Sequence, residues 1–289
     1  MSRLTREGRA DQIAFDVIAR TLDRRIVLRT TDRGIFHALQ YLACTPEIGG
    51  GAAATVAISI EQYREWHRIV EHGVPDKEVF DAKGAVDHLH GRVFAIGIGD
   101  RPGAALLHAA SLRRRGRRVL LVGGKGVGKT TLTLRLVRAG YEIEGDEHVF
   151  VGPGGVIARP RACRVKDTAL PLLADMADVI RAAPSYEFEH GRRIFNVDPR
   201  LVGGEWRIDQ GPVDHVIILQ SNHGGYSSMR PIGPLMLAQA LMAELAATDS
   251  GRGAAVAAVA ALANRARGFD LSLGDLERAI WFIDRLTDG

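Results

Sequence analysis

The stretch that decides the fold reads VLLVGGKGVGKTTLTLRLV and spans residues 119–137. An apolar strand-type run leads into a glycine-rich loop and then a helix-type run, and residues 123–130 match G-x-x-x-x-G-K-[ST] in full. Such glycines let backbone N–H groups surround phosphate oxygens at the positive end of the following helix. Lys129 would reach the β- and γ-phosphates of a nucleotide, and the Thr130 hydroxyl would bind Mg²⁺. A site for ATP and Mg²⁺ is therefore predicted on Gly123, Gly124, Lys125, Gly126, Val127, Gly128, Lys129, Thr130 and Thr131.

The acidic partner of the metal does not stand at the end of a later apolar strand, where nucleotide-binding proteins with this loop usually carry it. The best later strand, residues 216–219, is followed by Gln-Ser-Asn. Instead, Asp146 and Glu147 come directly after the helix that follows the loop. A strand returning beside the strand of the loop would bring both carboxylates next to the transferred phosphate. One would help to hold Mg²⁺, and the other would accept a proton from an incoming hydroxyl.

The order of these segments resembles the HPr kinase/phosphorylase family. Residues 106–110 (LLHAA) are followed by a hairpin, the glycine-rich loop and residues 139–147 (AGYEIEGDE). The chain is more similar still to the shorter bacterial HPr-kinase-related kinases, over roughly residues 85–287. This resemblance implies an α/β fold with a P-loop-containing kinase core of the HPr kinase/PEP carboxykinase-like type. It also implies a Mg-ATP-dependent kinase that phosphorylates a serine-type hydroxyl.

The resemblance also implies roles for individual residues. His108 matches a histidine that partners the catalytic aspartate, and Asp146 matches that aspartate, which takes the proton of the hydroxyl. Glu147 matches the second acid, expected to bind the metal with Asp146 and Thr130. Lys166 matches a lysine that neutralises charge on the moving phosphoryl group, as Lys129 would. Glu147 replaces an aspartate, and the signature loop with which HPr kinases engage HPr is not found, so HPr is not the expected acceptor.

The apolar patterning predicts two domains: a small N-terminal α/β module over residues 1–95 and the catalytic domain over residues 96–289. In the module we expect a helix over 8–22, a strand over 25–29, a helix over 34–43 that the glycines at 49–51 end, a strand over 55–60 and a helix over 82–93. In the catalytic domain we expect a hairpin of 106–112 and 118–122, and strands over 142–144, 148–152 and 213–219. Helices near 232–247, 253–266 and 275–287 would close the chain.

The composition of the 289 residues excludes several classes of protein. Apolar residues make up 46% and charged residues 25%, which excludes wholesale disorder. Two cysteines, Cys44 and Cys163, cannot build a disulfide framework or a four-thiolate zinc site, so a reducing, cytoplasmic location is expected. The N-terminus lacks the apolar core of a signal peptide, and the longest apolar stretch, 254–263, is shorter than the roughly 20 residues of a membrane span. A net charge of +4, spread among acids, favours neither a nucleic-acid nor a membrane partner.

The expected partners are a nucleotide and a hydroxyl-bearing peptide, protein or small molecule. A homo-oligomer is compatible with the resemblance, because HPr kinases are hexameric. Two alternatives to a kinase remain open: a P-loop ATPase or nucleotide-dependent switch, and a catalytically silent nucleotide-binding interaction protein. The arginines of residues 113–118 (RRRGRR) predict a solvated turn, with a dock for an acidic substrate as the alternative.

Overall fold

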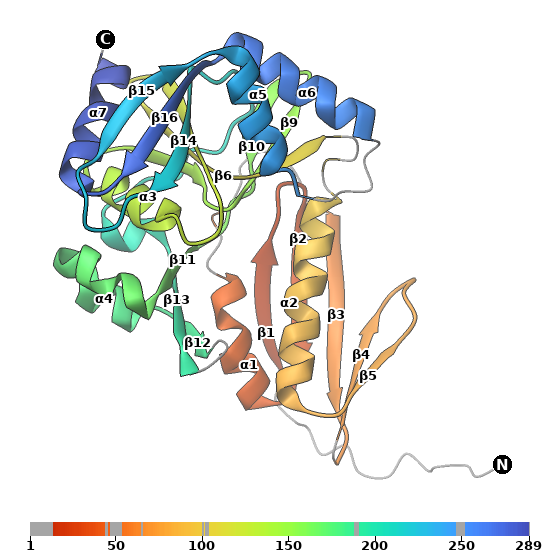
Figure 1. Cartoon of the computed structure of the whole chain (residues 1–289). Coiled ribbons are helices and arrows are strands. Elements are labelled where there is room, and N and C mark those ends of the chain that lie inside the picture. The colour runs from red at the N-terminus through yellow and green to blue at the C-terminus, as the bar shows by residue number, and fades with distance from the viewer. Residues whose placement is uncertain are drawn as a thin grey trace.

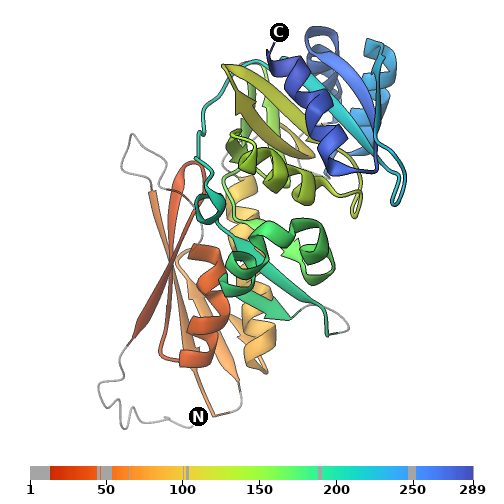
Figure 2. The same cartoon turned by 90° about the vertical axis from the view of Figure 1, so that its left-hand side faces the viewer.

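The N-terminal strands form a sheet of their own in the computed structural model, which describes residues 14–43, 46, 54–64, 66–99, 101, 104–187, 191–246 and 252–288. The five strands lie side by side in chain order, with β2 and β3 parallel and the other neighbours antiparallel. They are β1 (Phe15–Arg20), β2 (Arg24–Thr30), β3 (Ala54–Gln62), β4 (His67–Glu71) and β5 (Lys77–Val79). The helices α1 (Arg33–Leu39) and α2 (Ala82–Ile98) cover one face of this sheet and share its apolar core (Figure 2). A short 3-10 helix, η1 (Gln40–Ala43), follows α1.

The helix expected over residues 8–22 is wrong in its described part, because residues 15–20 form β1. Val17 and Ala19 are buried while the residues between and beside them are more exposed, which is the period-two burial of a strand. Pairing with β2 thus overrides the helical spacing of the apolar residues. The other elements expected in the module are confirmed as β2, α1 with η1, β3 and α2. Residues 8–13 and the glycines at 49–51 lie outside the described residues.

A second sheet, of eight strands, carries the glycine-rich loop. Its strands lie in the order β10-β9-β6-β7-β14-β16-β15, and β8 also pairs with β6. They are β6 (Ala105–Arg114), β7 (Arg117–Val122), β8 (Glu142–Gly145), β9 (His148–Gly152), β10 (Gly155–Ala158), β14 (His215–Ser221), β15 (Ser228–Ile232) and β16 (Arg267–Leu273). Because β7, β14 and β16 are parallel, their C-terminal ends meet at one edge of the sheet, where the loop begins.

Helices cover both faces of this second sheet (Figure 1). Leu121 of β7 belongs to one core with α3 (Lys129–Arg138) and α7 (Leu276–Asp288). Its neighbours Leu120 and Val122 belong to the opposite core, with α5 (Pro234–Ala243) and α6 (Arg252–Arg265). This alternation is what a strand buried on both faces requires. The hairpin, the strands near 142–152 and 213–219, α3 and the three closing helices are confirmed, whereas β15 and β16 were not expected.

A third, small sheet, green to teal in Figure 2, lies below the second sheet and on the helix-covered side of the first. Its order is β11-β13-β12, formed by β11 (Cys163–Lys166), β12 (Ser185–Glu187) and β13 (Arg193–Val197). The helical turns around it are η2 (Asp167–Met176), α4 (Ala177–Ala182) and η4 (Pro199–Val202). The expected boundary between residues 95 and 96 falls inside α2, and the division into two domains stays a prediction. Within the described ranges, no helix has both the length and the apolar character needed to cross a membrane.

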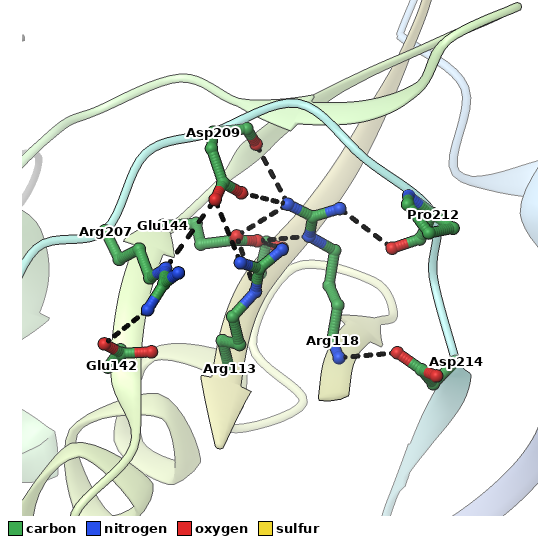
Figure 3. A network of polar contacts seen from close by, with 9 residues as sticks. Arg113, Arg118, Glu142, Glu144, Arg207, Asp209, Pro212 and Asp214 are labelled. Carbon is green, nitrogen blue, oxygen red and sulfur yellow. Dashed lines mark hydrogen bonds and ion pairs between the residues drawn. The ribbon is translucent and has the colours of Figure 1, made fainter. Parts of the chain in front are cut away.

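The tip of the arginine-rich hairpin, Arg115 and Gly116, is exposed to solvent as expected. The arginines on its strands instead pair with acids, among them Arg113 and Arg118 (Figure 3). Arg118 has 1% of its side chain exposed and binds both carboxylate oxygens of Glu144 at 2.7 and 2.8 Å. It also donates to Asp209 Oδ1 at 2.6 Å and to the Pro212 carbonyl at 2.8 Å. This network ties β7 to β8 and to the segment before β14. It therefore fixes the position of β8, the strand that Asp146 directly follows in the chain.

Candidate active site

The glycine-rich loop joins β7 to α3 and has the backbone shape that its glycines permit. Gly126 and Gly128 have φ values of +92° and +98°, in the left-handed region that favours glycine. A Cβ on Gly123 would stand 3.0 Å from the Leu219 carbonyl oxygen of β14, so the loop lies tightly against the neighbouring strand. Gly128 caps α3 without a side-chain hydrogen bond. The first N–H groups of this ten-residue helix are therefore left to bind an anion at the loop.

Lys129 begins α3 and lies inside the loop rather than in solvent. Its side chain is buried, and Nζ donates to the Gly123 carbonyl at 2.7 Å, across the loop. Burial lowers the pKa of Lys129, and nearby carboxylates, Asp146 first among them, oppose that shift. The ammonium group of Lys129 thus lies within the loop. There it can release the Gly123 carbonyl and bind the phosphate oxygens of a nucleotide instead.

Asp146 meets Thr130 at the start of the same helix. The Thr130 hydroxyl donates to Oδ2 of Asp146 at 2.8 Å, and Asp146 as a whole residue is 3% exposed. Its other oxygen, Oδ1, is buried without a hydrogen-bond partner among the described residues. Burial raises the pKa of Asp146, and the hydrogen bond from Thr130 partly opposes this. A buried carboxylate with an unsatisfied oxygen beside a hydroxyl suits either a divalent cation or a proton.

The strand geometry that brings Asp146 here differs from the expected one. β8 and β9 pair with β6 and not with β7, so the expected strand beside the strand of the loop is wrong. The acids reach the loop from one strand farther away, through the turn between β8 and β9. A hydrogen bond joins this turn to β6: the backbone N–H of Ala109 donates to the carbonyl of Glu147 at 3.1 Å.

Glu147 faces away from Thr130, toward two arginines. Its φ of +97° is unusual for a residue with a side chain and directs neighbouring carboxylates to different partners. Arg161 contacts Oε2, and Arg164 lies 3.7 Å from Oε1. Burial alone would raise the pKa of Glu147, but the charge of Arg161 and other cations lowers it to about 2. The expected metal role of Glu147 would require its carboxylate to exchange Arg161 for the metal.

His108 lies on β6 and is joined to an acid that the sequence analysis missed. Its backbone N–H donates to the Glu244 carbonyl at 3.0 Å, and its Nδ1 lies 3.5 Å from Oε2 of the same residue. Burial lowers the pKa of His108, and Lys129 lowers it further. A Cβ on Gly124 would stand 3.7 Å from Oε1 of Glu244, which places this carboxylate between His108 and the loop. Glu244 is the one charged residue in the apolar run 234–246, and that isolation was the available signal.

The remaining predicted residues lie at different distances from this centre. Thr131 is buried behind the loop, Val127 packs against the core, and Lys125 is exposed. Lys166 ends β11 in the small third sheet, and its catalytic role stays a prediction. Thr130 and Asp146 offer a cation two oxygen atoms. No group of three or more acidic, histidine or cysteine side chains in the described ranges forms a metal site, so phosphate and water oxygens would have to complete the coordination.

Comparison with known proteins gives distant likenesses among solved structures alone. No protein-family model matches the chain, and no curated protein matches it. Among solved structures, the HPr(Ser) kinase/phosphatase from Coxiella burnetii is similar, with 14% sequence identity and a TM-score of 0.32. The match covers 63% of this chain and 88% of that one. At this identity and TM-score the likeness is distant and says nothing of the function of this chain.

Proposed function

We propose that the protein is a Mg-ATP-dependent phosphotransferase that transfers the γ-phosphoryl group to a serine-type hydroxyl. The observation that carries the proposal is the hydrogen bond between Thr130 and Asp146, formed beside Lys129 at the N-terminus of α3. It places a hydroxyl, a buried carboxylate and an ammonium around one anion cradle. These groups are the ones that phosphoryl transfer needs for positioning and for charge neutralisation.

In this proposal ATP is held by the loop. The N–H groups of residues 123–131 surround its β- and γ-phosphates, and Lys129 leaves the Gly123 carbonyl to bind them. Thr130 and Asp146 would hold Mg²⁺, and the ion would supply further neutralisation of charge on the phosphate oxygens. The open side of Gly126, where an added Cβ would meet nothing within 4 Å, leaves the cradle accessible.

Asp146 would also act as the base. As the hydroxyl oxygen of the acceptor bonds to phosphorus and the bond to ADP breaks, the hydroxyl proton passes to Oδ1 of Asp146, the oxygen without a partner in the described structure. Its raised pKa brings the carboxylate closer to the proton affinity that a base needs near neutral pH. His108, held by Glu244, would face the same phosphoryl group from β6 as a positioning residue.

The test is phosphoryl transfer from labelled ATP with Mg²⁺ to a degenerate serine peptide library, with a parallel reaction that contains water alone. In the presence of Mg²⁺, Asp146→Asn should still bind ATP through the loop and Lys129, and it should lose transfer by roughly 10²-fold or more, because the base is lost. Asp178→Asn, on the exposed face of α4, is the matched control and should transfer normally. Transfer by Asp146→Asn at the wild-type rate would remove Asp146 from the chemistry, and turnover with water alone would favour an ATPase.

A further inference from the structure

A small cavity lies where the N-terminal module meets the segment that leads into the third sheet. Arg20, Tyr41 and His90 line it from the module, and Arg159, Arg161 and Asn196 line it from the other side. It contains about 30 Å³ of space open to water. Since a buried water needs at least about 10–15 Å³ of such space, the cavity has room for about two oxygen atoms.

The wall of this cavity is positively charged. Arg161 of the wall shares the carboxylate of Glu147 with Arg164, which lies outside the lining. Arg159 is 93% buried against α2, where it lies 5.1 Å above the Phe94 ring. Burial and the charges of these arginines lower the pKa of His90 to about 4, with Glu147 opposing. His90 is therefore neutral, and its Nδ1 lies 2.6 Å from the Tyr41 hydroxyl. Several guanidinium groups near one shared carboxylate create a potential that attracts a further anion.

The cavity is connected to the candidate active site through Arg161. This guanidinium lines the cavity and also contacts Glu147, whose neighbour in the chain is Asp146. On the other side, the ring of His148 lies 5.0 Å from Phe94, which also lines the cavity, and 6.4 Å from His108. A group bound in the cavity would thus lie beside the residues proposed to receive the acceptor.

We infer that this cavity binds a carboxylate of the phosphoryl acceptor, so that the enzyme selects acidic acceptors. The inference rests on the proposed function for the identity of the ligand, but the anion site itself does not. The small volume favours the two oxygens of a carboxylate over the four of a phosphate. Arg20, Arg159 and Arg161 would donate charge-assisted hydrogen bonds to them, and the Asn196 amide would add a neutral donor.

Binding can be tested without any catalysis, by titrating the ¹⁵N-labelled full chain with acetate and with its neutral isostere acetamide at constant ionic strength. The Asn196 side-chain amide signal should shift saturably with acetate and remain still with acetamide. Arg20→Gln should weaken acetate binding about tenfold or more, because a charge-assisted hydrogen bond is lost. Arg29→Gln, an exposed arginine on the neighbouring strand β2, should bind as wild type. Equal shifts with both ligands in the wild type would overturn the site, whether or not the variants fold.

The source of the carboxylate is tested with the serine peptide library. Phosphorylated peptides should be enriched in Asp or Glu at a fixed distance from the serine, and Arg20→Gln should lose that enrichment. Acetate should raise the KM for such a peptide and leave kcat unchanged. Peptides phosphorylated without acidic preference would overturn the inference and leave the proposed function standing. A change in kcat without competition would identify a free effector instead of an acceptor group, which also overturns it.

Discussion

The Thr130 hydroxyl donates a 2.8 Å hydrogen bond to Oδ2 of Asp146 and joins the first turn of α3 to the turn between β8 and β9. Asp146 stands sixteen positions after Thr130 in the chain, and the connection between them runs through the rest of the helix. The contact aligns a buried acid with the anion-binding end of that helix. The chemistry of the site depends on this alignment.

The first prediction concerns that hydrogen bond and the pH dependence of transfer. Thr130→Ala removes the donor that opposes the raised pKa of Asp146, so this pKa should rise further. The acidic limb of the kcat/KM profile, where Asp146 becomes protonated and cannot accept a proton, should then move to higher pH. Thr130→Ser keeps the donor and should keep the limb in place. An acidic limb at the same pH in both variants would show that Thr130 does not affect the pKa of Asp146, which contradicts the prediction.

A second prediction is that Asp146→Asn stabilises the fold at neutral pH. The folded-state pKa of Asp146 lies above its unfolded value, so this group favours folding only below the unfolded pKa, and the contribution is lost as pH rises through the folded one. Asn carries no charge to desolvate and can still accept from Thr130. Calorimetry should give a higher Tm for the variant at about pH 7.5, with the gain shrinking toward about pH 4. A lower Tm at about pH 7.5 would contradict the raised pKa.

Glu147 should show the opposite linkage, since its pKa falls from 4.5 to about 2 on folding. The group stabilises the fold above its unfolded pKa, and this contribution is lost as pH falls through that window. Glu147→Gln should lower the unfolding free energy at neutral pH by about 3 kcal/mol and flatten its dependence on pH between 4.5 and 2. Glu277→Gln, with 77% of its side chain exposed, is the control for a surface acid. Denaturant titrations across this pH range measure the unfolding free energy of each variant. If that free energy depends on pH in Glu147→Gln as steeply as in the wild type, the result argues against the ion pair.

Breaking the pair of Arg118 and Glu144 on one side should strongly destabilise the fold, although the pair lies outside the site. Arg118→Met leaves the Glu144 carboxylate buried without its main partner, which costs about 3–5 kcal/mol of unfolding free energy. Arg115→Gln, at the exposed end of the hairpin, should change stability by less than about 0.5 kcal/mol. Chemical denaturation compares the two variants. A double variant, Arg118→Met with Glu144→Met, should recover much of the loss, and no recovery would mean that the partners do not act as a pair.

Features that depend on residues close together in the chain could be predicted from the sequence, and features that depend on distant segments could not. The loop between β7 and α3 depends on neighbouring residues, so its pattern predicts the cradle directly. β1 depends on pairing with β2, and the helical spacing of its apolar residues was misleading. Glu244 reaches His108 only because the segment that follows α5 hydrogen-bonds to β6, so no local motif marks it. Asp146 was placed near the loop by its position after α3, although the strand order by which it arrives was wrong.

The most direct test of the central claim measures binding of ATP and ADP to the wild type and to Asp146→Asn in EDTA at about pH 8. If Asp146 faces the γ-phosphate, its charge repels ATP more than ADP when no metal is present. The variant should therefore gain affinity for ATP over ADP by about tenfold, an equilibrium change that needs no acceptor. An unchanged ratio of the two dissociation constants would place Asp146 away from the γ-phosphate and contradict the account.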